Sequence, residues 1–111
     1  MSIKPVAGIE PPCCAAVFTS VRRDGAEGYA ETAVRMRELV EEVPGFLGYE
    51  SAGTPGGLAI TGGYFRDAEA TAARRQNLDH QAAQRRGRAQ WYESCSVHVA
   101  EVERSYGFVR D

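Results

Sequence analysis

The chain has 111 residues, of which 43% are hydrophobic and 25% charged, a balance typical of one globular domain with a single modest core. A formal net charge of -2 excludes a global positive field that would attract nucleic acid. No apolar run is long enough to span a membrane, so we expect neither nucleic acid nor a membrane as a partner.

Residues 1–14 are predicted to form a flexible leader, because their first twelve positions hold three prolines and a glycine. The segment has no continuous apolar stretch of the kind found in signal peptides. Cys13, Cys14 and Cys95 have the spacing of neither a disulfide framework nor a zinc site. We therefore expect a cytoplasmic protein without a metal site, whose reduced cysteines fill strand positions.

A strand followed by a helix is predicted next. Residues 15–21 are apolar and rich in β-branched and aromatic types, which favours a strand. Asp24 and Glu27 have the spacing of a capping box at the start of a helix. Apolar residues then recur at steps of three and four, which predicts one stripe along a helix that ends at Pro44-Gly45. The stripe consists of Tyr29, Ala33, Met36, Val40 and Val43.

A hairpin follows the helix. Residues 46–52 and 58–65 read as strands, and the sequence "GTPGG" between them reads as a turn. Gly62 and Gly63 lie inside the second of these strands, where glycine costs stability. Either the strand bulges there or another group approaches its backbone closely, and a bulge is the favoured interpretation.

Residues 67–88 predict a second helix, with Asp67 as its cap and Gly87 near its end. Leu78 is its only large aliphatic residue, and its other apolar positions are alanines. Such a helix cannot fill a groove against a sheet with large side chains. It therefore either lies close to the sheet through its alanines or roofs a cavity.

Residues 91–108 predict a long last strand, with Val97 on one face and His98, an expected interface or rim residue, on the other. The apolar phase slips toward Val102, which suggests a bulge near Glu101. The resulting order β-α-β-β-α-β predicts an α+β, ferredoxin-like fold with both helices on one face of a four-stranded antiparallel sheet. The other sheet face needs cover, so we expect a homodimer.

Three stretches carry a resemblance to a known family. They are the residues from "AVFTSVRRDG" to "PGFLGYESA", then "LAITGGYF", then the helix end "DHQAAQRRGRAQWY" with the strand that follows it. Together they resemble the small stand-alone bacterial members of the antibiotic biosynthesis monooxygenase (ABM) superfamily. The resemblance spans residues 15–108, followed by a tail at 109–111, and implies a dimeric α+β barrel in which one strand end crosses to the partner.

Activities in that superfamily include cofactor-independent oxidation of polycyclic phenols, quinol oxidation and haem degradation. The haem-degrading branch pairs a second-helix histidine with a first-strand asparagine and a helix tryptophan. Here the first strand carries Thr19 and Ser20 instead of asparagine, and Trp91 stands outside the second helix. The resemblance therefore favours haem degradation less than oxidation of an aromatic substrate.

One face of the predicted second helix collects Arg74, Asn77 and His80. If it looks inward it predicts a wet pocket, because buried polar groups need partners; if it looks outward it is an ordinary solvated surface. Relatives often carry tryptophan where Arg74 stands, so the resemblance implies a more cationic pocket suited to an anionic or phenolate ligand.

We therefore hypothesise a monooxygenase that uses O2 and no cofactor on a small aromatic or quinol-like substrate. Arg74, Asn77 and His80 are its candidate catalytic residues, and its candidate substrate-binding residues are Tyr64 as a donor with Phe18 and Phe65 as walls. The alternative is a non-catalytic dimeric barrel that binds a small hydrophobic or anionic molecule.

Overall fold

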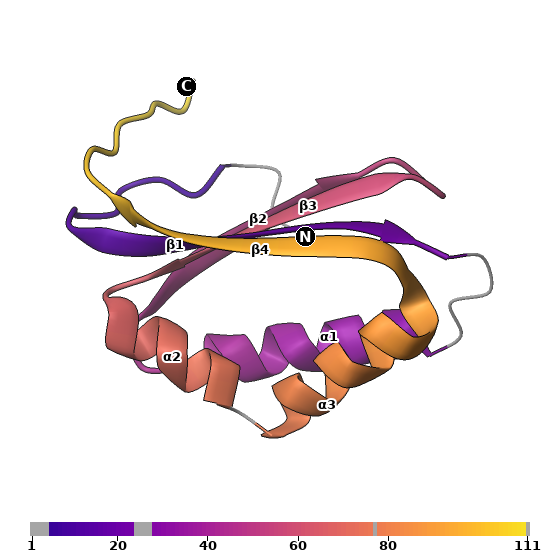
Figure 1. Ribbon diagram of the computed structural model, residues 1–111. Coiled ribbons are helices and arrows are strands. Elements are labelled where there is room, and N and C mark those ends of the chain that lie inside the picture. The colour runs from indigo at the N-terminus through magenta and orange to yellow at the C-terminus, as the bar shows by residue number, and fades with distance from the viewer. Residues whose placement is uncertain (1–4, 24–27, 77, 111) are drawn as a thin grey trace.

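The computed structural model describes residues 5–23, 28–76 and 78–110, and the side chains at 74–80 lie outside that description. The described chain forms one antiparallel sheet with helices on one side (Figure 1). In chain order the elements are β1 (Cys13–Arg22), α1 (Tyr29–Glu41), β2 (Phe46–Gly53), β3 (Leu58–Phe65), α2 (Ala68–Gln76), α3 (Leu78–Arg86), a π-helical segment η1 (Gly87–Trp91) and β4 (Tyr92–Val102).

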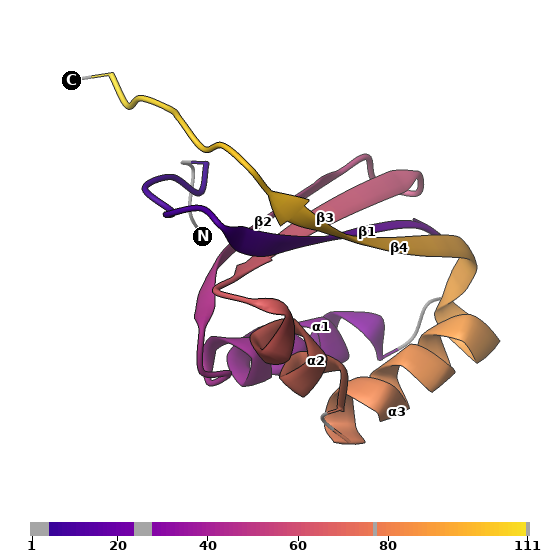
Figure 2. The ribbon, with the colours of Figure 1, turned by 60° about the vertical axis from the view of Figure 1, so that its left-hand side comes forward.

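The strand order across the sheet is β2-β3-β1-β4, with β1 and β3 in the centre. Each neighbouring pair is antiparallel, and α1, α2 and α3 all lie on the same face (Figures 1 and 2). This arrangement confirms the predicted ferredoxin-like α+β fold. The opposite sheet face carries none of the described helices (Figures 1 and 2).

Helix α1 follows the predicted apolar stripe but begins at Tyr29, with Gly28 as its N-cap. The capping box expected at Asp24 and Glu27 lies outside the described residues. The helix ends at Glu41, so Val43 of the predicted stripe lies beyond it, and the chain turns at Gly45 with φ 89° as expected. A side chain at Gly45 would also collide with Ala70, since its Cβ would lie 2.9 Å from the Cβ of Ala70.

The single helix predicted over 67–88 is described as two helices and a π-helical segment, and residue 77 between the helices lies outside the description. Asp67 caps α2 as expected, since the Ala70 amide donates to Asp67 Oδ1 at 2.9 Å. That amide and the neighbouring Arg66 guanidinium hold the pKa of Asp67 below its usual value. Gly87 begins the π-helical segment.

Each explanation offered for the alanine-rich helix holds for one part of it. Helix α2 lies close to the sheet, where Ala70 packs with Ala16 and Phe65 in the small buried core. Helix α3 instead lines a cavity with Ala83 and Gln84. The small side chains of α2 allow this helix to approach the sheet closely. The small side chains of α3 do not fill the space between that helix and the sheet.

Two predicted bulges are wrong. Gly62 and Gly63 pair in regular register with both β1 and β2, and the Cβ of a side chain at Gly63 would lie 3.3 Å from the Phe65 ring. Glu101 pairs regularly with Cys14 and Val102 with Cys13, so Val102 lies on the opposite face from Val99 without a bulge, and β4 ends at Val102 instead of at 108. The register shifts lie elsewhere, between Phe46 and Gly48 and between Val21 and Arg22.

The leader is shorter than predicted, because Cys13 and Cys14 already belong to β1. The Val6 amide donates to Glu50 Oε2 at 2.9 Å, and a Cβ at Gly48 would lie 3.3 Å from the methyl carbons of Val6. Among the described helices, none is long and apolar enough to cross a membrane.

Candidate functional site

A cavity of about 380 Å³ lies between the sheet and the helices. Its floor comes from the helix-facing residues of all four strands, and its roof comes from α1 and α3. The apolar stripe of α1 faces this space, which explains why no residue of α1 is buried. Most of the stripe therefore lines a cavity, and Val40 also packs against the small buried core.

One end of the cavity, which we call the aromatic end, is formed by Phe18, Tyr29, Trp91 and Tyr92. The ring of Tyr29 makes edge contacts with Trp91 at 5.6 Å and with Tyr92 at 5.9 Å between centroids. Tyr92 also meets Phe18 edge-on at 5.5 Å. These pairs hold the rings in fixed orientations around the space.

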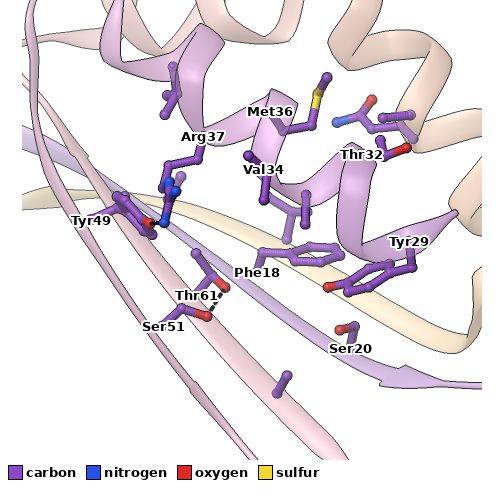
Figure 3. A pocket seen from close by; sticks show the side chains of 18 of the residues that line it. Phe18, Ser20, Tyr29, Thr32, Val34, Met36, Arg37, Tyr49, Ser51 and Thr61 are labelled. Carbon is purple, nitrogen blue, oxygen red and sulfur yellow. Dashed lines mark hydrogen bonds between the residues drawn. The ribbon is translucent and has the colours of Figure 1, made fainter. Parts of the chain in front are cut away.

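The other end, which we call the polar end, is formed by Arg37, Tyr49, Ser51 and Thr61. Arg37 reaches from α1 toward β2, where its Nη1 donates to Tyr49 Oη at 3.4 Å (Figure 3). The hydroxyls of Ser51 and Thr61 lie 2.7 Å apart across the β2–β3 pair. The cavity is thus mainly aromatic at one end, where the hydroxyls of Tyr29 and Tyr92 are its polar groups, and mainly polar at the other.

The titratable groups among the described lining residues are Arg37 and three tyrosines, without a carboxylate or an imidazole. Burial raises the pKa of the Tyr92 hydroxyl well above its usual value, and the nearby Tyr29 raises it further. Tyr92 therefore stays protonated near neutral pH and acts as a hydrogen-bond donor rather than a base. The described lining can stabilise an anion but offers no group suited to removing a proton at that pH.

Two of the six predicted site residues, Phe18 and Phe65, line the cavity. Tyr64 lies on the opposite sheet face, where its hydroxyl donates to Glu50 Oε1 at 3.0 Å and burial raises its pKa. It therefore does not serve the cavity as the expected donor. His98 pairs with Val17 and is exposed on that same face.

The three predicted catalytic residues, Arg74, Asn77 and His80, cannot be placed around the cavity. Asn77 lies outside the described residues, and for Arg74 in α2 and His80 in α3 only the backbone is described. Their roles remain predictions.

Sequence reasoning missed the polar end, although the strand alternation carried a signal for it. Residues of one strand that differ by two share a sheet face, so Thr61 lies on the face of Phe65, and Ser51 pairs directly with Thr61. The aromatic end was missed because Trp91 read as the first residue of the last strand. It is instead the buried last residue of η1.

The family model for antibiotic biosynthesis monooxygenases matches residues 12–86. The chain belongs to the ABM family. It is 45% identical over 95 residues to the uncharacterized protein YqjZ of Bacillus subtilis (strain 168), covering 86% of this chain and 83% of that protein. Membership in the ABM family agrees with the observed fold.

Two solved structures share the ABM fold at low sequence identity. Rv0793 from Mycobacterium tuberculosis has a TM-score of 0.73 at 13% identity, covering 86% of this chain and 99% of that one. A variant of SnoaB, a cofactor-independent oxygenase from Streptomyces nogalater, has a TM-score of 0.72 at 9% identity, covering 85% and 96%. At such identities the likeness concerns the fold alone.

Proposed function

We propose that this ABM protein is a cofactor-independent monooxygenase that oxidises a small aromatic or quinol-like substrate with O2. The observation that carries the proposal is the cavity whose aromatic end is walled by edge-packed rings and whose polar end supplies donors. Family membership supports the reaction class, and the similarly folded SnoaB is a cofactor-independent oxygenase.

The chemistry requires no reductant besides the substrate. With a 1-naphthol, one atom of O2 becomes the new carbonyl oxygen opposite the hydroxyl, and the other leaves as water with two hydrogens of the substrate. The product is the 1,4-naphthoquinone, and the substrate supplies all four electrons. The protein must favour the phenolate form, which passes an electron to O2, by placing donors at the developing anion in an otherwise apolar space.

Several residues have roles in this proposal. Phe18 and Phe65 hold the rings of the substrate, and the hydrogen bond between the Tyr92 and Tyr29 hydroxyls leaves one hydrogen to donate to an oxygen anion. Because no described lining residue is a suitable base, we assign proton removal to His80, with Arg74 and Asn77 as further donors. Under this assignment His80→Gln lowers the turnover rate of a naphthol and leaves its binding nearly unchanged.

The test compares two substitutions on α1. Ala33 lines the cavity, whereas Ala30 is exposed outside it, so Ala33→Phe fills the space and Ala30→Phe is the matched control. We expect wild-type protein and Ala30→Phe to consume O2 and form quinone from a panel of naphthols and anthrones. Ala33→Phe should lose at least about tenfold in kcat/KM, which corresponds to about 1.4 kcal/mol.

The absence of a base among the described lining residues favours one alternative, a dimeric barrel that binds a small hydrophobic or anionic molecule without turnover. The same panel separates the two functions. No O2 consumption by wild-type protein, together with a rise in Tm caused by the same compounds, would refute the oxygenase and support the binder.

A further inference from the structure

The polar end of the cavity has a chemical bias that the proposed function does not use. All four of its side chains carry hydrogens that can be donated, and none is a carboxylate. Their hydrogen bonds to one another leave several of these hydrogens free.

Tyr49 accepts a hydrogen bond from Arg37, so the hydrogen of its own hydroxyl remains available to a ligand. The Ser51–Thr61 pair uses one of its two hydroxyl hydrogens in the bond between them, whichever atom donates. The other hydrogen also remains available. Two neutral donors therefore accompany the guanidinium at this end (Figure 3).

Arg37 is the only cation in the described lining, and no described carboxylate lies within salt-bridge distance of it. Glu38 pairs with Arg35 at 3.6 Å, while Glu38 and Glu41 act electrostatically on Arg37 from beyond salt-bridge distance. The hydrogen bond with Tyr49 raises the pKa of Arg37 above its usual value, so it stays charged at all working pH values. A cation and two donors that point to one space match an anionic acceptor.

We propose that the natural ligand is an aromatic carboxylate, with its ring at the aromatic end and its carboxylate held by Arg37 and Tyr49. Arg37 is thereby the residue that determines specificity. The inference deepens the proposed function and rests on the same cavity, but binding of the carboxylate requires no turnover. Because Arg37 is exposed to solvent, its preference for an anion is worth about two- to fivefold in affinity rather than the larger factor of a buried pair.

The test uses two probes of nearly equal shape, 5-hydroxy-2-naphthoate and its neutral carboxamide. Binding is measured at neutral pH without oxygen, by calorimetry and by quenching of Trp91, the only tryptophan in the sequence, which lines the cavity. In wild-type protein the carboxylate should bind about two- to fivefold more tightly than the carboxamide, and added salt should reduce the difference.

Arg37→Met should remove this preference, and Tyr49→Phe should reduce it in part. Arg35→Met is the matched control, because Arg35 lies on the same helix outside the cavity, and it should keep the wild-type preference. Equal wild-type affinity for the two probes, a preference that survives Arg37→Met, or no binding of the carboxylate would each overturn the inference. Unchanged Tm values show that each variant folds.

The two proposals fail in different ways. A carboxylate preference that depends on Arg37, without oxidation of either probe in air, would refute the oxygenase and leave the anion site in place. Oxidation of both probes with equal KM would support the oxygenase and refute the carboxylate preference.

Discussion

Tyr92 illustrates how the surroundings of one residue decide its chemistry. Its ring packs edge-on against Phe18 and Tyr29, and this burial raises the pKa of its hydroxyl. A hydroxyl that ionises with difficulty remains a donor, and at the cavity wall a donor stabilises an anion of the ligand. The same shift has a consequence for stability at high pH.

In the unfolded chain the hydroxyl of Tyr92 ionises near pH 10, but in the folded protein it ionises only at higher pH. Below pH 10 the hydroxyl is protonated in both states and does not change the free energy of unfolding. Above pH 10 the unfolded chain ionises first, so the free energy of unfolding falls as the pH rises. We expect Tyr92→Phe to flatten the decline of the unfolding free energy above pH 10, measured by urea denaturation. Burial also raises the pKa of Tyr64, which leaves a smaller decline in the variant.

Tyr106→Phe is the control for this prediction, since the Tyr106 side chain is 94% exposed. It should decline above pH 10 as the wild type does. Identical curves for all three proteins would contradict the assigned role of burial at Tyr92.

At the scale of elements, the π-helical segment η1 determines the shape of the aromatic end. It joins α3 to β4 and places Trp91 and Tyr92 in succession against Tyr29. Gly87 at its start is buried, and a Cβ there would lie 2.6 Å from Cε2 of the Tyr92 ring. Any side chain at this position must push that ring out of its contacts.

Gly87→Ala is therefore expected to destabilise the protein by about 1–3 kcal/mol, the usual cost of overpacking. It should also weaken binding of aromatic ligands, because Tyr92 moves. Denaturation with urea measures the first effect and quenching of Trp91 the second. Gly107→Ala is the control, since nothing lies within 4 Å of a Cβ at Gly107. Equal stability of the two variants would show that the ring yields without cost.

The elements also show what the sequence could and could not predict. The patterns of apolar residues predicted all four strands and α1, because each of these elements turns one apolar side toward the interior. The same periodicity cannot tell a helix that faces a cavity from one that packs on a core, so the space under α1 was not foreseen. The scarcity of large residues in 67–88 and the polar face of Arg74, Asn77 and His80 were the two sequence features that pointed to a cavity.

The alternation of side chains along a strand already separates two of the predicted site residues. Neighbouring strand residues point to opposite faces, so Tyr64 and Phe65 cannot both line one cavity. The Arg37–Tyr49 contact joins α1 to β2 and depends on how far the helix stands from the sheet. Patterns within single elements carry no information about that distance.

At the scale of the whole molecule, the chain exposes more surface than a compact monomer of its size. Its accessible area is 8009 Å², whereas about 6,000 Å² is usual for a monomer of this mass. Part of the excess lies on the helix-free sheet face, where Val17, Leu58 and Ile60 are 36%, 49% and 46% exposed. Part lies in the segment after β4, where Tyr106 and Phe108 are 94% and 80% exposed.

An interface of standard size covers about 800 Å² on each partner, which this excess can supply. We therefore predict a homodimer in which the helix-free faces of two sheets pack together. Ile60→Lys places a charge at the centre of that interface and should yield monomers at micromolar concentration, measured by light scattering. Val99→Lys is the matched control, because Val99 is similarly exposed at 51% but faces the helix side beside Ala16. It should remain dimeric, and a monomeric wild-type protein or equal dissociation of both variants would contradict the packing of these faces.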